Sequence, residues 1–570
     1  MYEMAIALQG LKLNRSKTKL YKQGHHGGIA SVASECRDHG IVAVNGFLAG
    51  GAPIGDAQFV QDELKSTFDY LSVVCEKIRQ LFIHNKSKKK AKIKELASVT
   101  HQDVYRIIRW CVSPSMTNHL LRSIAPNVIK QQVARFDTAV YDLLLSLLDA
   151  DADDDLCSML NADGVLTNDI VRLRASMGGL SIGSAAKTAH QAYIGSLCLV
   201  LPLVKSALGD SFTSIEAANL FPELSLALSD GSLAPIKIFK DVTLDTLLNK
   251  SVEKVQRAVG AVNARKAAAD ILERIVDPKD KAWFLSGREH GATWLTAYPK
   301  HSEGLNDNQW CTLVRSRLNL VVVKGFDGTD TVCPDCADTQ SQSEPSRRLQ
   351  RNGTHALHCM QSGRGGARGQ RSTRAMTMKF TIIDALRPAA RKSDLGTGYL
   401  CEKEPIVTDY YPAKAGAAIN SVNNRADFAI YMGASFLADA VLTHPTPSSH
   451  PTSVKSPGAA AVAASKKKLT SYYSLFDIPV GRLVPFSYET GGFVCPQTME
   501  FIRSFVKYGM ATGAETEPDW TPYNRAEYAS RLRSICDSIS INIARSVANT
   551  LIAGSTALSS RLLADPPPSP

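Results

Sequence analysis

Apolar side chains recur mostly every three or four residues in the stretch that begins near residue 57. This spacing places them on one face of an amphipathic helix. The clearest series is Phe59, Leu64, Phe68, Leu71, Val74 and Ile78. We therefore expect residues 57–200 to be helical. Residues 201–330 continue as a helical connector, with one long periodic helix over residues 252–275.

Two apolar runs further along the chain have the pattern of strands in a hairpin. Residues 428–431 and 436–442 flank a short turn over residues 432–435. Asp427 and Asp439 stand one at each strand, although aspartate is a poor strand former. Each could cap a turn or protect a sheet edge. Alternatively, the two carboxylates could share a Mg²⁺ or Mn²⁺ ion, because hard cations prefer oxygen ligands from adjacent segments.

The rest of the C-terminal third alternates between helix and strand patterns. Further elements are expected over residues 373–386 (helix), 482–492 (buried strand and turn), 496–508 (helix) and 528–553 (helix). Residues 445–465 are rich in Pro, Ser and Ala and are predicted to be a disordered insertion, with the next helix starting at Lys466. The predicted fold class is α+β, with a mostly helical N-terminal half and an α/β domain at the C-terminal end.

Composition favours an intracellular protein with a polyanionic partner. The chain has 570 residues, 44% of them hydrophobic, which is enough for several domains. The net charge of +11 suggests a polyanionic partner, and a ribosomal or membrane-surface partner would give the same sign of charge as DNA or RNA. DNA or RNA is the partner that we predict. We find no apolar run of membrane-spanning length and no signal-peptide pattern. The 12 cysteines are mostly scattered singly, as in a reducing compartment. We therefore expect a nuclear or cytoplasmic location, no secretion and no membrane partner.

A lysine-rich run stands near the end of the first predicted helix. Its lysines are Lys86, Lys88, Lys89, Lys90, Lys92 and Lys94. Such a run is typical of a solvated face or a nuclear-import signal. Equally, it could be a tip that contacts phosphates, because lysine ammonium groups neutralise the nucleic-acid backbone. The residues leave both interpretations open.

Four residues have the spacing of a zinc knuckle. Cys333-Pro-Asp-Cys336 is followed, after eighteen residues, by His355-Ala-Leu-His-Cys359. Thiolates and imidazole suit Zn²⁺, and the first pair places two sulfurs on one tight turn. The predicted ligands are Cys333, Cys336, His355 and Cys359, with His358 as the competing imidazole. Because protein groups fill all four positions, the predicted site is structural.

Several motifs in the N-terminal half come in a distinctive order. The turn Gly46-Phe-Leu-Ala-Gly-Gly-Ala-Pro-Ile-Gly55 is followed by Asn118-His-Leu-Leu-Arg122, Arg135-Phe-Asp137 and Met177-Gly-Gly-Leu-Ser-Ile182. This series resembles the last palm segment and the thumb of the reverse transcriptases of non-LTR (LINE-type) retrotransposons. The resemblance implies binding to a nucleic-acid backbone. It also implies that the catalytic aspartates of the polymerase belong upstream of Met1, so no polymerase chemistry is expected.

The C-terminal part has a second set of family motifs. Arg425-Ala-Asp427, then Asp439 and then a lysine on the following helix resemble the PD-(D/E)XK, restriction-enzyme-like endonuclease of the same retrotransposon polyproteins. The resemblance implies that Asp427 and Asp439 hold a catalytic Mg²⁺ or Mn²⁺. It assigns the catalytic lysine to Lys468 or Lys467.

Other residues of this endonuclease motif set agree with the family less closely. The resemblance makes Glu404 a possible third acidic residue, although a surface glutamate before a proline explains it equally well. Arg425 becomes a nucleic-acid-binding residue by the same resemblance. Two positions depart from the family: Arg374-Ala375 replaces an Arg-His pair, and Val441 stands where a lysine would follow Asp439.

Together these patterns predict five segments: a palm remnant (1–56), a thumb-like helical domain (57–200), a helical connector (201–330), a zinc knuckle (331–365) and an endonuclease domain (366–560). The expected function is that of a truncated retrotransposon polyprotein with a metal-dependent DNA endonuclease. The alternative is a nucleic-acid-binding remnant of a retroelement whose active site has decayed.

Overall fold

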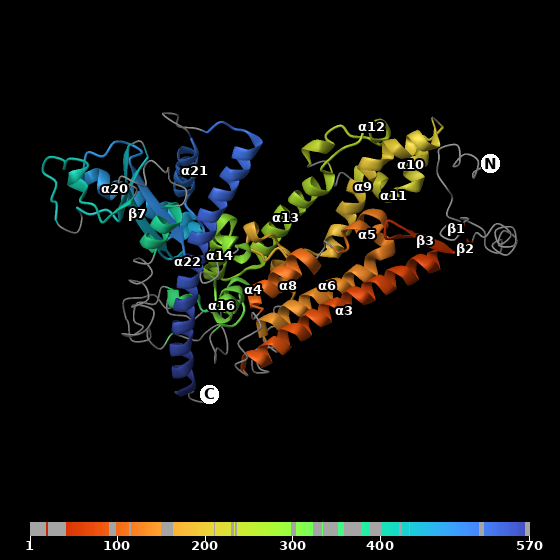
Figure 1. The fold of residues 1–570 in the computed structure, drawn as a ribbon, viewed down its shortest axis with the longest axis horizontal. Coiled ribbons are helices and arrows are strands. Elements are labelled where there is room, and N and C mark those ends of the chain that lie inside the picture. Colours follow the sequence, from red (N-terminus) through yellow and green to blue (C-terminus); the bar gives the residue numbers. More distant parts are fainter. Residues whose placement is uncertain are drawn as a thin grey trace. The chain divides into compact units, whose positions relative to one another are not determined.

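The computed structural model describes most of the chain (Figure 1). The described residues are 19–20, 42–90, 99–112, 116–149, 164–209, 211–229, 233, 236–297, 304–322, 333, 352–357, 378–387, 401–420, 424–432, 434–511 and 518–564. They belong to two compact units. Unit 1 comprises Met1–Ser98, Ile107–Leu147 and Gly183–Asn263; unit 2 comprises Val99–Arg106, Leu148–Ile182 and Ala264–Pro570.

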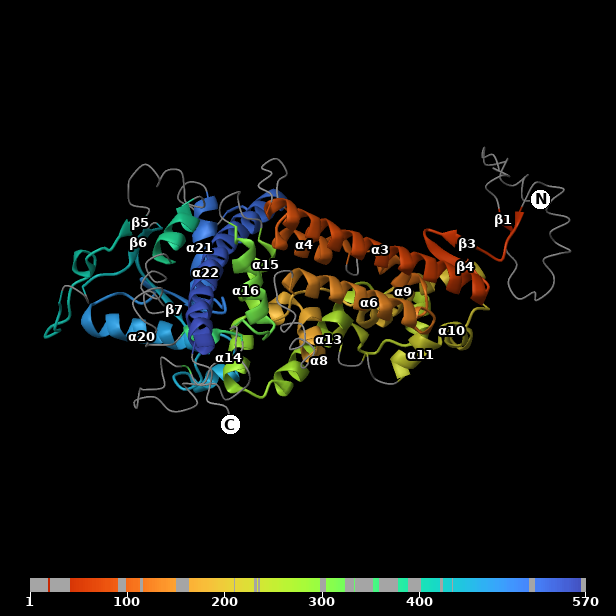
Figure 2. The ribbon, with the colours of Figure 1, turned by 90° about the horizontal axis from the view of Figure 1, so that it is seen from below.

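Two long helices form one part of unit 1. Helices α3 (Ala57–Lys90) and α6 (Pro126–Asp149) lie side by side in two perpendicular views (Figures 1 and 2). The buried rings of Phe68 and Phe136 meet edge to face, with centroids 5.9 Å apart. Leu64 and Leu71 are buried on the same side of α3 as Phe68. The helical periodicity predicted for this stretch is therefore confirmed.

A second apolar core of unit 1 surrounds helix α9 (Ala185–Leu208). Ile194, Leu197, Cys198 and Leu201 of α9 are buried against the helices that follow. Among the described residues, α9 is the one helix long and apolar enough to cross a membrane. Its buried face contributes to the apolar core of this unit.

The remaining elements of unit 1 are short, apart from the long helix that leads out of it. They are β1 (Lys19–Leu20), β2 (Val42–Ala43), β3 (Gly46–Ala49), β4 (Ala52–Gly55), the π-helix η1 (Ile108–Val112), α5 (Asn118–Ser123), α10 (Ser214–Leu220), α11 (Pro222–Ser229), η3 (Lys237–Phe239), α12 (Leu244–Asn249) and α13 (Val255–Arg274). Strands β3 and β4 pair antiparallel, whereas β1 and β2 pair parallel. Helix α13 confirms the long helix predicted over residues 252–275.

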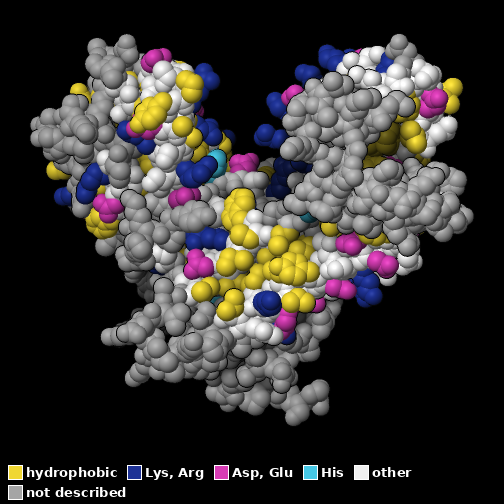
Figure 3. Space-filling model, turned by 45° about the vertical axis from the view of Figure 1, so that its right-hand side comes forward, with side chains coloured by type: hydrophobic (Ala, Val, Ile, Leu, Met, Phe, Trp, Pro, Cys, Tyr) yellow, Lys and Arg dark blue, Asp and Glu magenta, His cyan; other side chains and the backbone are white. Residues whose placement is uncertain are grey.

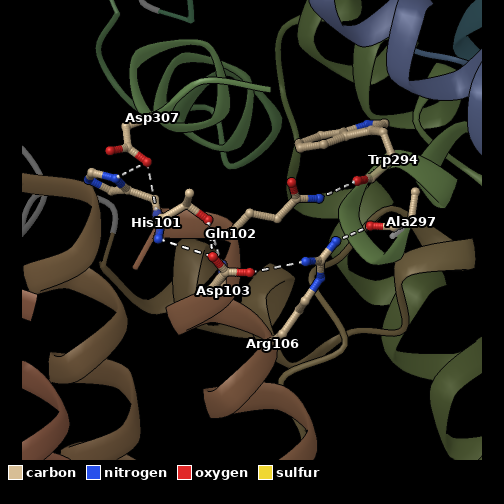
Figure 4. Close-up of polar contacts among 8 residues, drawn as sticks. His101, Gln102, Asp103, Arg106, Trp294, Ala297 and Asp307 are labelled. Carbon is tan, nitrogen blue, oxygen red and sulfur yellow. Dashed lines mark hydrogen bonds and ion pairs between the residues drawn. The ribbon is translucent and has the colours of Figure 1, made fainter. Parts of the chain in front are cut away.

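The helical part of unit 2 contains short helices held by polar contacts. Its elements are α4 (His101–Ile107), α8 (Gly164–Arg172), η2 (Ala175–Met177), α14 (Pro278–Ser286), η4 (Glu289–Ala292), α15 (Thr293–Thr296), α16 (Asp307–Arg317) and η5 (Thr354–Leu357). Figure 4 shows how the start of α4 is attached. His101 Nδ1 lies 2.9 Å from Asp307 Oδ1, and the Arg106 guanidinium donates to the Ala297 carbonyl.

Arg317 at the end of α16 is a buried cation that fixes the backbone of a neighbouring segment. Its Nε donates to Gly179 O at 3.1 Å, and its Nη2 donates to Ala175 O at 2.8 Å. Burial lowers the pKa of Arg317 to about 10, so the guanidinium stays protonated at neutral pH. Gly178, with φ of 103°, ends η2 at this point.

The C-terminal part of unit 2 has three layers built on a four-stranded sheet. The strands are β5 (Cys401–Lys403), β6 (Phe428–Tyr431), β7 (Ser435–Thr443) and β8 (Leu483–Glu489), in the order β5-β6-β7-β8. Strands β5, β6 and β7 pair antiparallel, and β7 pairs parallel with β8. Helix α20 (Ala459–Leu475) connects the parallel pair. The predicted two-strand hairpin and the buried strand after it are confirmed.

Each face of this sheet is covered by a different helix. On one face, α20 contributes Tyr472 and Phe476 to a core that also contains Leu437 of β7. On the other face, α21 (Pro496–Met510) places Phe501 against Phe486 of β8, with ring centroids 5.6 Å apart. Short 3-10 turns η7 (Val407–Asp409) and η8 (Pro451–Val454) precede and follow the hairpin. The last helix, α22 (Pro522–Ala564), packs on α15, α16 and α21.

The prediction of a disordered insertion over residues 445–465 is wrong. This stretch contains η8 and the first turns of α20, which begins at Ala459 rather than at Lys466. The reason is a cap from a distant part of the chain. The buried carboxylate of Glu489 accepts hydrogen bonds from the backbone N–H groups of Ala460, at 2.9 Å, and Ala461, at 3.3 Å. A carboxylate at a helix N-terminus stabilises the helix.

The fold class is therefore α+β, as the sequence predicted, and the described residues are mostly helical. Closing helices are also present where the sequence predicted them, although α22 extends further at both ends than residues 528–553. Within the helix predicted over residues 373–386, residues 378–386 are helical, and residues 373–377 lie outside the described part of the chain.

Candidate metal centre

The register of the hairpin brings two aspartates opposite each other. Phe428 of β6 pairs with Ala438 of β7, so Asp427, one residue before β6, stands opposite Asp439. The Asp427 N–H donates to Ala438 O at 3.1 Å and continues the ladder. Side chains of directly opposite residues lie on the same face of an antiparallel pair. Both aspartates consequently face α20, because Leu437 and Ala429 on this side of the sheet pack against that helix.

Burial makes this pair of carboxylates electrostatically unusual. The Asp439 side chain is 7% exposed and that of Asp427 is 27% exposed. Burial, and then the neighbouring charge of Asp439, raise the pKa of Asp427 from 3.8 to about 6. A hydrogen bond from the Ala440 N–H to Asp427 Oδ2, at 2.8 Å, opposes part of this rise. The pair thus carries less negative charge near pH 6 than two separate aspartates would.

Helix α20 supplies a lysine to the pair. Lys468 Nζ lies 2.8 Å from Asp439 Oδ2, whereas Lys467 is exposed to solvent. Of the two lysines that the sequence proposed, Lys468 is therefore the one that contacts the site. One turn later, the Tyr472 hydroxyl donates to Arg425 O at 2.8 Å. Burial and the two nearby aspartates raise the pKa of Tyr472, so this phenol stays protonated.

A second lysine, which the sequence did not single out, reaches the pair from residues 378–386. Lys379 Nζ lies 2.6 Å from Glu404 Oε1 and 3.5 Å from Asp427 Oδ1. The hydrogen bond to Glu404 raises the pKa of Lys379, and the same contact lowers the pKa of Glu404. The available signal was one lysine near the start of a predicted helix, and such a residue is common on helix surfaces.

Glu404 and Arg425 line the same corner of the sheet. Glu404 has a φ of +52°, which is uncommon for a residue with a side chain, and its N–H donates to Asp427 O at 3.0 Å. Its carboxylate is 55% exposed and contacts Lys379. The exposed Arg425 donates from Nη1 to Glu404 O at 3.3 Å. The backbone hydrogen bonds hold Glu404 in its strained conformation.

The two aspartates fit a magnesium-type ion that also uses substrate oxygens. Mg²⁺ is commonly held by one or two carboxylates together with water and phosphate oxygens. Asp427 and Asp439 offer hard oxygen donors from adjacent strands, which is the donor set that such an ion requires. Across the described ranges, no three His, Cys, Asp and Glu side chains form a group that could hold a metal ion. A bound ion would therefore depend on these two carboxylates and on oxygens from solvent or substrate.

The predicted zinc knuckle lies only partly within the described residues. Cys333 is buried, and His355 is buried on η5. Cys336, His358 and Cys359 lie outside the described residues, so the zinc site remains a prediction. The choice between His355 and His358 also remains open.

The predicted phosphate-contacting run coincides with the end of α3. Lys86, Lys88, Lys89 and Lys90 belong to this helix, and Lys92 and Lys94 lie outside the described residues. On the face shown in Figure 3, the Lys and Arg side chains that are coloured stand scattered among Asp and Glu, and hydrophobic side chains gather near its middle.

Comparison with known proteins adds no assignment to this geometry. No protein-family model matches the chain, and no curated protein matches it. The resemblance to retrotransposon proteins therefore stays a prediction from the sequence motifs.

Proposed function

We propose that this chain binds nucleic acid and cleaves DNA with a divalent-metal-dependent endonuclease domain within residues 366–560. One observation carries the proposal. Asp427 and Asp439 stand opposite each other on neighbouring strands, and Lys468 Nζ lies 2.8 Å from Asp439. Paired carboxylates with an adjacent ammonium group suit the hydrolysis of a phosphodiester bond. The sequence motifs support the origin of the domain in a retrotransposon polyprotein.

Each residue of the site has a defined role in this proposal. Asp427 and Asp439 would hold Mg²⁺ or Mn²⁺, which, when bound, supplies an activated water molecule and neutralises charge on the phosphate. Lys468 would orient the attacking water or stabilise the negative charge that develops on the phosphate oxygens. Its contact with Asp439 keeps the ammonium group beside the carboxylate pair. Helix α20 positions Lys468, and the Glu489 cap positions the start of that helix.

The net positive charge of the chain supports a polyanionic partner. The chain carries a net charge of +11, and its lysine-rich run ends helix α3. A phosphate-contacting surface would make binding salt-dependent, with a slope of about −0.9 in log K against log salt per phosphate contacted. We therefore propose DNA, RNA or both as partners. Replacing Lys88, Lys89 and Lys90 with Ala should flatten that slope by up to about three units.

A nicking assay on supercoiled plasmid with Mg²⁺ or Mn²⁺ tests the activity. The wild-type chain should convert supercoiled plasmid to open circles, and EDTA should stop the reaction. Asp427→Asn and Lys468→Met should each abolish nicking. Lys467→Met is the matched control, because this exposed lysine neighbours Lys468 on the same helix. Metal-independent nicking, or full activity in Asp427→Asn, would refute the assignment.

A binding protein with a decayed active site is the second candidate. It is favoured by one observation: no third acidic ligand joins the two aspartates within the part of the chain that the structure describes. In this case the wild-type chain would bind duplex DNA with the salt dependence given above and would leave the plasmid intact with either metal.

A structural zinc ion completes the proposal. Cys333, Cys336, His355 and Cys359 would hold one Zn²⁺ per chain and fix the segment around η5. Elemental analysis should find one zinc ion per chain, and Cys336→Ser should lower that content. An unchanged zinc content in the variant would remove this part of the proposal.

A further inference from the structure

We propose that Lys379 is a positioning residue that acts as an internal counter-ion of the Asp427–Asp439 pair, and that Glu404 acts through Lys379 rather than as a third metal ligand. This inference rests on the proposed function, because it assumes that the pair binds a divalent cation. It assigns opposite effects on metal affinity to two residues that contact each other.

The first step is the place of the Lys379 ammonium group. Nζ lies between two carboxylates, at 2.6 Å from Glu404 Oε1 and at 3.5 Å from Asp427 Oδ1. The side chain is 15% exposed, so solvent screens these contacts less than it would on an open surface. Met378 and Ile382 are buried on the same helical segment and hold Lys379 at the edge of the site. The ammonium group thus occupies one side of the carboxylate that would bind the cation.

The second step is that Glu404 draws the Lys379 ammonium group toward itself and away from Asp427. Glu404 is fixed at the end of β5 by its backbone contact with Asp427 and by its φ of +52°. Its contact with Lys379 is the shorter of the two, so Glu404 holds the ammonium group away from Asp427 Oδ1. Without Glu404, Lys379 would have Asp427 as its nearest acidic partner and would compete with a cation for that oxygen.

The third step concerns the role that the sequence motifs suggested for Glu404. Its carboxylate is 55% exposed and is engaged with Lys379. The described residues contain no group of three acidic, His or Cys side chains that could hold a metal ion. Glu404 can therefore influence the cation by setting the position of a positive charge. Like charges repel, so removing a positive charge near a cation site should tighten cation binding.

The test is a double-mutant cycle on Mn²⁺ affinity, measured by isothermal titration calorimetry with the full chain and Mn²⁺ alone. Lys379→Met should tighten Mn²⁺ binding by about tenfold, an effect of the size expected for one nearby charge. Glu404→Gln should weaken it several-fold. In the Lys379→Met background, Glu404→Gln should have no further effect, because the residue through which it acts is gone.

Three further variants complete the experiment. Lys379→Arg retains the charge and should leave Mn²⁺ affinity near that of the wild type, whereas Lys379→Gln should repeat the tightening if Lys379→Met fails to fold. Lys455→Met is the matched control, because this exposed lysine lies on the loop after η8 and should not affect the site. Equal weakening by Glu404→Gln in both backgrounds would show direct ligation and overturn the inference.

The outcomes also separate this inference from the proposed function. Wild-type chain that binds no Mn²⁺ would overturn both. Wild-type chain that binds Mn²⁺, with an affinity that Lys379→Met and Lys379→Gln leave unchanged, would overturn the counter-ion role alone and leave the endonuclease proposal standing.

Discussion

Replacing Asp427 with Asn should stabilise the metal-free protein at neutral pH. Burial and the charge of Asp439 raise the pKa of Asp427 from 3.8 to about 6, so the folded protein resists ionisation of this group. Asparagine is neutral and retains an oxygen that can accept the Ala440 N–H. The substitution therefore removes the buried charge and keeps the backbone hydrogen bond.

The magnitude follows from the difference between the two pKa values. A folded-state pKa raised by about two pH units, at roughly 1.4 kcal/mol per unit, makes ionised Asp427 cost about 3 kcal/mol. Because the pKa of Asp427 is higher in the folded protein than in the unfolded chain, the folded state loses stability as the pH rises. This loss is absent below the unfolded-state pKa near 4, and it grows until the pH passes about 6. The attraction of Lys379 and the hydrogen bond from the Ala440 N–H both lower the pKa of Asp427 and are already included in the value of about 6, so about 3 kcal/mol is the net cost of ionised Asp427.

Thermal denaturation in EDTA between pH 4 and pH 8 measures this effect. Asp427→Asn should melt at a higher temperature than the wild type at pH 8 and at the same temperature at pH 4. The control is Asp409→Asn, which changes an exposed aspartate on η7 and should not reproduce this pattern. A lower melting temperature for Asp427→Asn at pH 8 would show that the attraction to Lys379 outweighs burial and repulsion, and would refute the reasoning.

Further predictions concern groups that fix the fold around the site. Arg317→Lys should destabilise the protein by about 1–3 kcal/mol, because lysine cannot make both of the buried contacts of the guanidinium; an unchanged melting temperature would contradict this. Glu489→Ala should cost about 0.5–2 kcal/mol by removing the cap of α20, and hydrogen exchange should show faster opening of its first turn. Gly458→Ala should destabilise more than Gly481→Ala in thermal melts. Both glycines have positive φ, but only at Gly458 would a Cβ meet a ring, that of Phe493, at 1.9 Å; equal losses would contradict the packing argument.

Local patterns were sufficient for the hairpin and for most helices. Residues 428–431 form a strand as predicted, because a short apolar run and the flanking turn are encoded within a few residues. The start of α20 could not be predicted in the same way. Its alanine-rich first turns depend on the carboxylate of Glu489, which reaches them from the end of β8. Without that distant contact, the composition of residues 445–465, rich in Pro, Ser and Ala, predicts disorder.

In the candidate site, too, the residues that follow from local sequence order were predicted, and the contacts that depend on distant packing were not. Asp427, Asp439 and Lys468 were identified from their order along the chain, and the sheet register brings them together. Lys379 was missed because its contacts with Glu404 and Asp427 depend on how a distant helix packs on the sheet edge. Composition does not encode that packing. The strained backbone of Glu404 was likewise invisible in the sequence, since glutamate has no preference for positive φ.

The central claim is that Asp427 and Asp439 share a divalent cation. Anomalous X-ray diffraction from crystals of the full chain soaked in Mn²⁺, with data collected near the manganese absorption edge, tests this claim most directly. The account predicts an anomalous peak between the two carboxylates in the wild-type protein and no such peak in Asp439→Asn crystals. A wild-type map without a peak at this position, or with manganese bound only elsewhere, would contradict it.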